Sequence, residues 1–153
     1  MTYELKLERL IDAPPELVFD TMVDPDAQPE IFAEEVPGWN LWECRIDLRV
    51  GGEWTFVYGR KDRAGEPDRN TSVFTEIDRP SRLAYRASMF VSEWGRTVDF
   101  TETITFEERD GKTLVTIEVT ELELEEDRDA FMSGLPGYLD ALERVVVKKA
   151  TGS

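Results

Sequence analysis

The sequence predicts an α+β fold in which a curved antiparallel sheet packs against a long C-terminal helix. Three observations support this. The chain opens with an alternating strand that leads directly into an amphipathic helix, its middle to about residue 122 is dominated by period-two alternation, and its last segment changes to steps of three and four. At 153 residues the chain has the length of one ordinary domain, so we expect a single domain over residues 1–150 and a short tail at residues 151–153.

The N-terminal elements are expected to be a strand and two short helices. Alternation predicts a strand over residues 3–11, and the sequence DAPP joins it to an amphipathic helix over residues 16–23. The turn-forming sequence DPD follows that helix, and a second short helix is expected over residues 27–33 before Pro37 and Gly38.

Strand patterns follow as far as residue 122. Residues 43–49 alternate between apolar and charged side chains, which indicates a half-buried strand. Gly51 and Gly52 tolerate positive φ and so favour a tight hairpin into a strand over residues 53–58. The charged segment 61–70 is expected to be an exposed loop. Further strands are expected over residues 72–77, 82–88, 97–106 and 114–122, which makes the sheet an antiparallel meander.

An apolar stripe with helical spacing predicts the last element. Its members are Phe131, Leu135, Tyr138, Leu139, Leu142, Val145 and Val146. Pro136 lies inside this stripe between Gly134 and Gly137, and proline removes a backbone donor. The helix is therefore expected to kink there or to begin anew at Pro136.

This order of elements resembles the START-like helix-grip superfamily, which includes the polyketide-cyclase-like and Bet v-like proteins. The sequence RLIDAPPELVF (residues 9–19) looks like the opening motif of the branch related to the activator of a heat-shock chaperone's ATPase. DLRVGGEW (residues 47–54) and EIDRPSRL (residues 76–83) resemble that branch's second and third motifs. Gly137 and Tyr138 fit its closing helix, although the family more often has tryptophan after that glycine. The resemblance covers nearly the whole chain and implies a sheet wrapped around the C-terminal helix.

The resemblance implies several possible functions, because one fold hosts many. The superfamily includes lipid and hormone carriers, aromatase and cyclase enzymes, and chaperone activators. The eukaryotic activators are similar to this chain over one domain and carry a separate N-terminal chaperone-binding domain, which these 153 residues do not include.

Composition argues against several kinds of partner. The formal net charge of −15 would repel nucleic acids and anionic lipid surfaces, and no run is apolar enough for membrane insertion. Cys44 is the sole cysteine, so no intrachain disulfide can form, and we expect a cytoplasmic protein and an inert thiol. The acidity has two interpretations, a solvated surface that keeps the protein soluble or adaptation to a salty cytoplasm.

The chain contains no histidine, which excludes histidine-dependent triads and the usual Cys and His zinc sites. Gly51 and Gly52 have no Walker spacing around them, so nucleotide binding has no support. We therefore expect neither a metal nor a cofactor. The remaining chemical groups are carboxylates, arginines and tyrosines within an apolar shell.

Alternation places two charged residues on the predicted inward face of the sheet. Glu102 shares a face with Phe100 and Ile104, and Arg9 shares a face with Leu7. Because both residues are predicted to lie on the inward face, we hypothesise that Arg9 contacts Glu102. Two interpretations stay open: these residues are rim residues or satisfied structural ions, or they orient a polar group of an apolar ligand.

The other candidate ligand-binding residues are large side chains expected to lie between sheet and helix: Trp54, Phe56, Tyr58, Tyr85, Phe100, Phe131, Leu135 and Tyr138. The alternative is that they simply form the core. Trp39, Trp42 and Trp94 are expected in or beside loops, where apolar residues cap pockets or form interfaces.

These patterns lead to one functional hypothesis and two rivals. The protein is expected to bind a small hydrophobic or aromatic molecule in an internal cavity, with Arg9, Glu102 and Tyr138 as polar contacts, and to be a monomer or homodimer. The first rival is a cyclase, dehydratase or hydrolase that uses carboxylate and tyrosine acid-base chemistry in a wide pocket. The second is a cochaperone-like protein-binding module with an exposed apolar patch around Trp39, Trp42 and Trp94.

Overall fold

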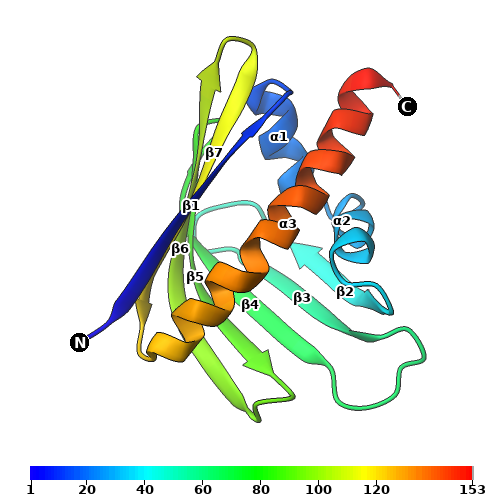
Figure 1. Ribbon diagram of the computed structural model, residues 1–153, viewed down its shortest axis with the longest axis vertical. Helices are drawn as coiled ribbons and strands as arrows, with labels where there is room; N and C mark the ends of the chain where they lie inside the picture. Colours follow the sequence, from blue (N-terminus) through cyan, green and yellow to red (C-terminus); the bar gives the residue numbers. More distant parts are fainter. Residues whose placement is uncertain (153) are drawn as a thin grey trace.

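The computed structural model describes residues 1–152, in which a curved seven-stranded antiparallel sheet packs against three helices (Figure 1). The strands are β1 (Tyr3–Ile11), β2 (Trp39–Ile46), β3 (Glu53–Arg60), β4 (Asp68–Asp78), β5 (Arg82–Val91), β6 (Arg96–Arg109) and β7 (Lys112–Leu122), and the helices are α1 (Pro15–Met22), α2 (Gln28–Glu35) and α3 (Glu125–Thr151). The strand order is β1-β7-β6-β5-β4-β3-β2. The predicted α+β helix-grip fold is confirmed, because all three helices lie on one side of the sheet and α3 crosses it.

The junction between β1 and α1 is a core element. Pro15 occupies the start of α1, where its missing N–H would have had no helical acceptor. The Thr113 hydroxyl donates a 2.7 Å hydrogen bond to the Ala13 carbonyl, which ties the junction to β7. Phe19 is fully buried and meets the ring of Phe106 edge to face at 5.3 Å. The N-terminal segment therefore anchors α1 against the sheet.

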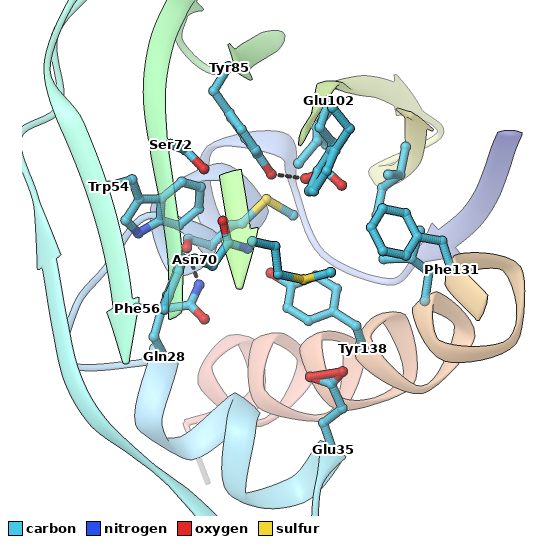
Figure 2. Close-up of a pocket in the computed structure, with 16 residues that line it drawn as sticks. Gln28, Glu35, Trp54, Phe56, Asn70, Ser72, Tyr85, Glu102, Phe131 and Tyr138 are labelled. Carbon is cyan, nitrogen blue, oxygen red and sulfur yellow. Dashed lines mark hydrogen bonds between the residues drawn. The ribbon is translucent and has the colours of Figure 1, made fainter. Parts of the chain in front are cut away.

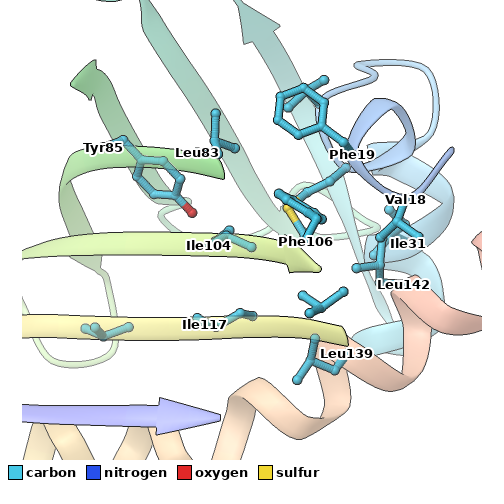
Figure 3. Close-up of a cluster of buried hydrophobic side chains, with 14 of the residues drawn as sticks. Val18, Phe19, Ile31, Leu83, Tyr85, Ile104, Phe106, Ile117, Leu139 and Leu142 are labelled. Carbon is cyan, nitrogen blue, oxygen red and sulfur yellow. The ribbon is translucent and has the colours of Figure 1, made fainter. Parts of the chain in front are cut away.

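The two halves of helix α3 differ in burial. Its C-terminal half is buried against the sheet and α1, and Leu139 and Leu142 lie in the core with Phe106 (Figure 3). Its N-terminal half carries mostly half-buried or exposed side chains, and Asp127 is the buried exception. Although α3 has 27 residues, neither it nor another helix within residues 1–152 has the length and apolar character to span a bilayer. Gly152 ends α3 at a φ of 75°, and Ser153, the end of the predicted tail, lies outside the described residues.

Pro136 does not start a new helix, because α3 continues through it. The proline deprives the Met132 carbonyl of its helical donor. Met132 is 45% exposed, so water can take the place of that donor. The alternative of a helix beginning at Pro136 is therefore wrong.

Strand β2 begins and ends earlier than its alternation suggested. It covers Trp39–Ile46, so Trp42 lies within a strand, while Trp39 begins that strand beside a loop. Leu48 continues the period-two pattern but is exposed, because the chain has already turned. The turn is closed by a 2.9 Å hydrogen bond from the Arg49 amide to the Asp47 carbonyl. Strand β4 also begins at Asp68, inside the segment expected to be a loop.

Replacement of Gly52 by alanine is expected to destabilise the protein by about 2 kcal/mol or more. An added Cβ would lie 2.1 Å from the Asp47 carbonyl oxygen, a backbone atom that cannot rotate away. Gly134→Ala is the control, since no atom lies within 4 Å of its added Cβ. That helix substitution should stabilise the protein by about 0.5–1 kcal/mol. Urea denaturation of both variants tests this, and a Gly52→Ala protein as stable as wild type would contradict the turn geometry.

Candidate functional site

A cavity of about 220 Å³ lies between the sheet and helices α2 and α3 (Figure 2). Strands β3 to β7 and all three helices contribute to its wall. The lining residues are Met22, Gln28, Glu35, Trp54, Phe56, Asn70, Ser72, Tyr85, Met89, Phe100, Glu102, Ile104, Ile117, Phe131, Leu135 and Tyr138. Eight of the ten residues predicted from sequence are among them.

Aromatic rings form most of the apolar wall. Trp54 meets Tyr85 edge to face at 5.6 Å and Phe56 at 5.1 Å. On the other side, Phe100 of β6 meets Phe131 of α3 edge to face at 5.0 Å. Such ring pairs stabilise the packing by more than the burial of their apolar surface alone. The sheet side and the helix side of the wall are thus both built from packed aromatics.

The central polar feature of the cavity is the pair Tyr85 and Glu102. These residues are direct cross-strand partners on β5 and β6, which brings their side chains together on the same face. The Tyr85 hydroxyl donates a hydrogen bond to Glu102 Oε2. Burial raises the pKa of Glu102 to about 7. A carboxyl group that exchanges its proton near neutral pH therefore faces the cavity.

A second group of polar side chains comes from the helices. Burial also raises the pKa of Glu35 on α2 to about 7. The pKa of Tyr138 is raised above its ordinary value, chiefly by burial, while Gln28 acts in the opposite direction and the charges of Glu35 and Glu102 add to the rise. The Gln28 amide donates to the Met22 carbonyl, which holds it in the wall. Tyr138 therefore stays protonated and can donate a hydrogen bond.

Strand β4 adds two small polar residues, Asn70 and Ser72. Asn70 Oδ1 is buried and has no hydrogen-bond partner within residues 1–152. A buried acceptor without a donor costs about 1–3 kcal/mol, so a bound molecule with a donor would offset that cost. Within the same residues, no three Cys, Asp or Glu side chains gather as metal ligands would.

Comparison with protein families gives a match over residues 12–147 to activator of Hsp90 ATPase homolog 1-like proteins. The chain belongs to this family. The matched region contains the whole cavity wall, from Met22 to Tyr138. Among curated proteins, none matches the sequence.

Solved structures of similar proteins confirm the fold. The chain superposes with a TM-score of 0.79 on an uncharacterised protein of Rhizobium leguminosarum, at 26% identity over 97% of this chain and 96% of that one. A protein of Nitrosomonas europaea gives the same TM-score at 21% identity over 95% of each chain. The Hsp90-activator-like protein of Aeromonas hydrophila, solved by NMR in solution, gives a TM-score of 0.73 at 26% identity, over 98% of this chain and 94% of that one.

Arg9, part of the first sequence motif that resembles the family, does not reach the cavity or Glu102. It lies on the same half-buried face of β1 as Leu7, as alternation suggested, and residues of α3 cover that part of the face. Its guanidinium lies 2.7 Å from Asp140 Oδ1 and 3.0 Å from Glu143 Oε1. The hypothesis of an Arg9 contact with Glu102 is therefore wrong, and Arg9 joins β1 to α3.

Tyr58 is the other predicted residue outside the cavity wall. It shares the face of Trp54 and Phe56 but lies two residues further along β3. There, Phe32 of α2 covers its ring at a centroid distance of 5.1 Å. Burial raises the pKa of the Tyr58 hydroxyl, which keeps it protonated. Tyr58 thus packs α2 onto the sheet.

Sequence reasoning missed most of the polar cavity wall in this family member. Ser72 lies on the same face as Phe74 within the strand expected over residues 72–77, so alternation could have found it, and Asn70 would have followed had the strand been extended to residue 68. Gln28 and Glu35 carry no such signal, because α2 is short and its apolar side is weakly marked. Cys44 is half-buried, and burial raises its thiol pKa to about 11, which agrees with the expectation of an inert residue.

Proposed function

We propose that this protein binds a small hydrophobic or aromatic molecule in the cavity between its sheet and α3. The observation that carries the proposal is an internal space with aromatic walls and a few polar groups, which is the usual composition of ligand sites. A dry cavity of about 150 Å³ in another protein holds benzene. A volume of about 220 Å³ therefore suits one aromatic ring with a short substituent.

The cavity exists because one strand changes side-chain size along its inward face. Phe74 of β4 is fully packed in the core, where it stacks on Trp54 at 5.6 Å. The next inward position along the strand is Ser72, whose side chain is too small to fill the corresponding space. A larger residue at position 72 would occupy the volume that we assign to the ligand.

2-Phenylethanol is a suitable neutral probe, since it combines one ring with a short polar chain. We expect it to bind with a stoichiometry of one by calorimetry and to raise the thermal midpoint by mass action. The variant Ser72→Leu should lose at least about tenfold in affinity because its side chain fills the site. Thr71→Leu adds the same side chain on the outer face of β4 and should leave affinity unchanged. Binding that survives in Ser72→Leu would place the probe elsewhere, and no binding to wild type would refute the proposal.

A second candidate function is acid-base catalysis on a bound molecule. The specific observation in its favour is the Tyr85 and Glu102 pair, in which the carboxyl pKa of about 7 suits proton transfer at neutral pH. The volume of the cavity would limit the substrate to a single ring with a short substituent. In a catalyst, Glu102→Gln would abolish turnover while a neutral ligand still bound.

The family name refers to activation of a chaperone ATPase, but the tryptophan surface expected for a protein-binding module has less support. Trp42 is half-buried, and the Arg63 guanidinium lies 4.6 Å from its ring. Trp94 is 40% exposed, and Arg96 lies 5.0 Å from its ring. Both rings are therefore partly covered by arginines instead of forming an open apolar surface.

A further inference from the structure

The charged groups of the cavity all have the same sign. Glu35 and Glu102 line it, whereas no lysine or arginine within the described chain does. A ligand with a carboxylate or a phosphate would find no opposite charge there, and burial without a partner is very costly for such groups. The charge of the wall therefore disfavours an organic acid.

Two acceptors, Asn70 Oδ1 and the Glu102 carboxyl, and the aromatic rings favour a ligand that donates hydrogen bonds or carries a positive charge. Asn70 Oδ1 is a buried acceptor without a partner in the described residues, and the hydrogen bond from Tyr85 goes to Glu102 Oε2. An ammonium group carries three donors and no acceptor, so it matches this set. The faces of Trp54 and the phenylalanine rings attract cations as well.

We propose that the cavity selects a small aromatic amine over neutral and acidic molecules of the same shape, with its ammonium group beside Glu102. This inference rests on the proposed ligand-binding function and specifies the chemical class of the ligand. Glu102 is the better partner because its cross-strand bond to Tyr85 orients the carboxyl, whereas Glu35 lies beyond Tyr138 in Figure 2. The aromatic ring of the ligand lies among the apolar walls.

Proton exchange by Glu102 links binding of the amine to pH. The titratable groups that share the cavity with it are Tyr85 from β5, Tyr138 from α3 and Glu35 from α2, and β7 contributes Ile117, which does not titrate. An ammonium ion stabilises the ionised carboxyl, whose pKa is raised to about 7 by burial. Affinity for the amine therefore rises with pH up to about 7 and is level above it until the amine itself loses its proton.

Three probes of equal size separate the possibilities: 2-phenylethylamine, 2-phenylethanol and phenylacetate. At pH 8, we expect the amine to bind at least about tenfold more tightly than the alcohol, and phenylacetate to show no binding by calorimetry. Between pH 5.5 and 7, the affinity of the amine should rise by about fifteenfold in total and that of the alcohol should stay constant. The pH series on wild type needs no variant, so it tests the inference even if a substitution disturbs folding.

Variants then assign the effect to one carboxyl group. Glu102→Gln should weaken binding of the amine by more than about tenfold and should remove the rise of its affinity between pH 5.5 and 7. Glu118→Gln, the same chemical change on the exposed face of β7, should leave the affinities of the amine and the alcohol unchanged. If the alcohol binds wild type as tightly as the amine, the inference is wrong and the proposed function stands. If no probe binds, the proposed function itself fails.

Discussion

Replacing Glu102 with glutamine is expected to stabilise the protein by about 2–3 kcal/mol at pH 8, and by about 1 kcal/mol near pH 5.5. The reason is that burial raises the carboxyl pKa from 4.5 in the unfolded chain to about 7 in the folded protein. Between these values the folded state binds more protons than the unfolded state. The contribution of the Glu102 carboxyl to the free energy of unfolding is therefore complete below pH 4.5. It falls as the pH rises towards 7 and stays low at higher pH.

Glutamine keeps the shape of the side chain and an acceptor for the Tyr85 hydroxyl, but it has no charge to bury. Urea denaturation at several pH values measures the effect, with Glu118→Gln as the exposed control. Part of the pH dependence should remain in Glu102→Gln, because Glu35 also has a raised pKa. A Glu102→Gln protein less stable than wild type at pH 8 would mean that the ionised carboxyl has a stabilising partner.

Leu142→Ala should destabilise the protein by about 3–4 kcal/mol, the largest loss that we expect from a single substitution in α3. Leu142 is fully buried in the core and does not line the cavity. Leu135→Ala, two turns earlier, removes the same atoms from a half-buried position and should cost only about 1 kcal/mol.

The two leucine variants should rank in the opposite order when ligand affinity is measured instead of stability. Leu135 lines the cavity, so its loss removes contacts with a bound ring and should weaken binding of 2-phenylethanol several-fold, on the order of 1 kcal/mol. Leu142→Ala should bind the probe as wild type does under conditions where it is folded. Urea denaturation and calorimetry on both proteins test this, and parallel losses in stability and affinity would contradict the division of α3 into a core half and a cavity half.

The sequence was sufficient for the fold because the signals are local and repeated along the chain. Each pattern defines one element and limits which elements can follow it in the fold. The patterns are the alternation in β6 and β7, the helical stripe of α3 and the segment at residues 9–19. Strand ends were harder to predict. In β2, a register shift between Leu41 and Glu43 breaks the alternation, and the turn at Asp47 ends the strand although the pattern runs on.

The candidate site was predictable only for residues on strands, because alternation assigns each of them to one face of the sheet. Parity correctly placed Glu102 and Phe100 on the inward face, but it does not tell which element covers that face. Arg9 shows this limit, because the helix above it supplies Asp140 and Glu143 as partners. Glu35 shows the converse, since the packing of α2 brings a carboxyl group to the cavity that no motif marks.

The central claim is that a small molecule enters the space between the sheet and α3, and the four methionines offer the most direct test of it. Met22 and Met89 line the cavity, whereas Met1 and Met132 are exposed on the surface. Methyl-labelled methionine therefore gives two reporters and two internal controls in one NMR spectrum. On titration with 2-phenylethanol, the methyl signals of Met22 and Met89 should shift and saturate together while those of Met1 and Met132 stay in place. Shifts confined to the exposed methionines, or none at all, would contradict the claim.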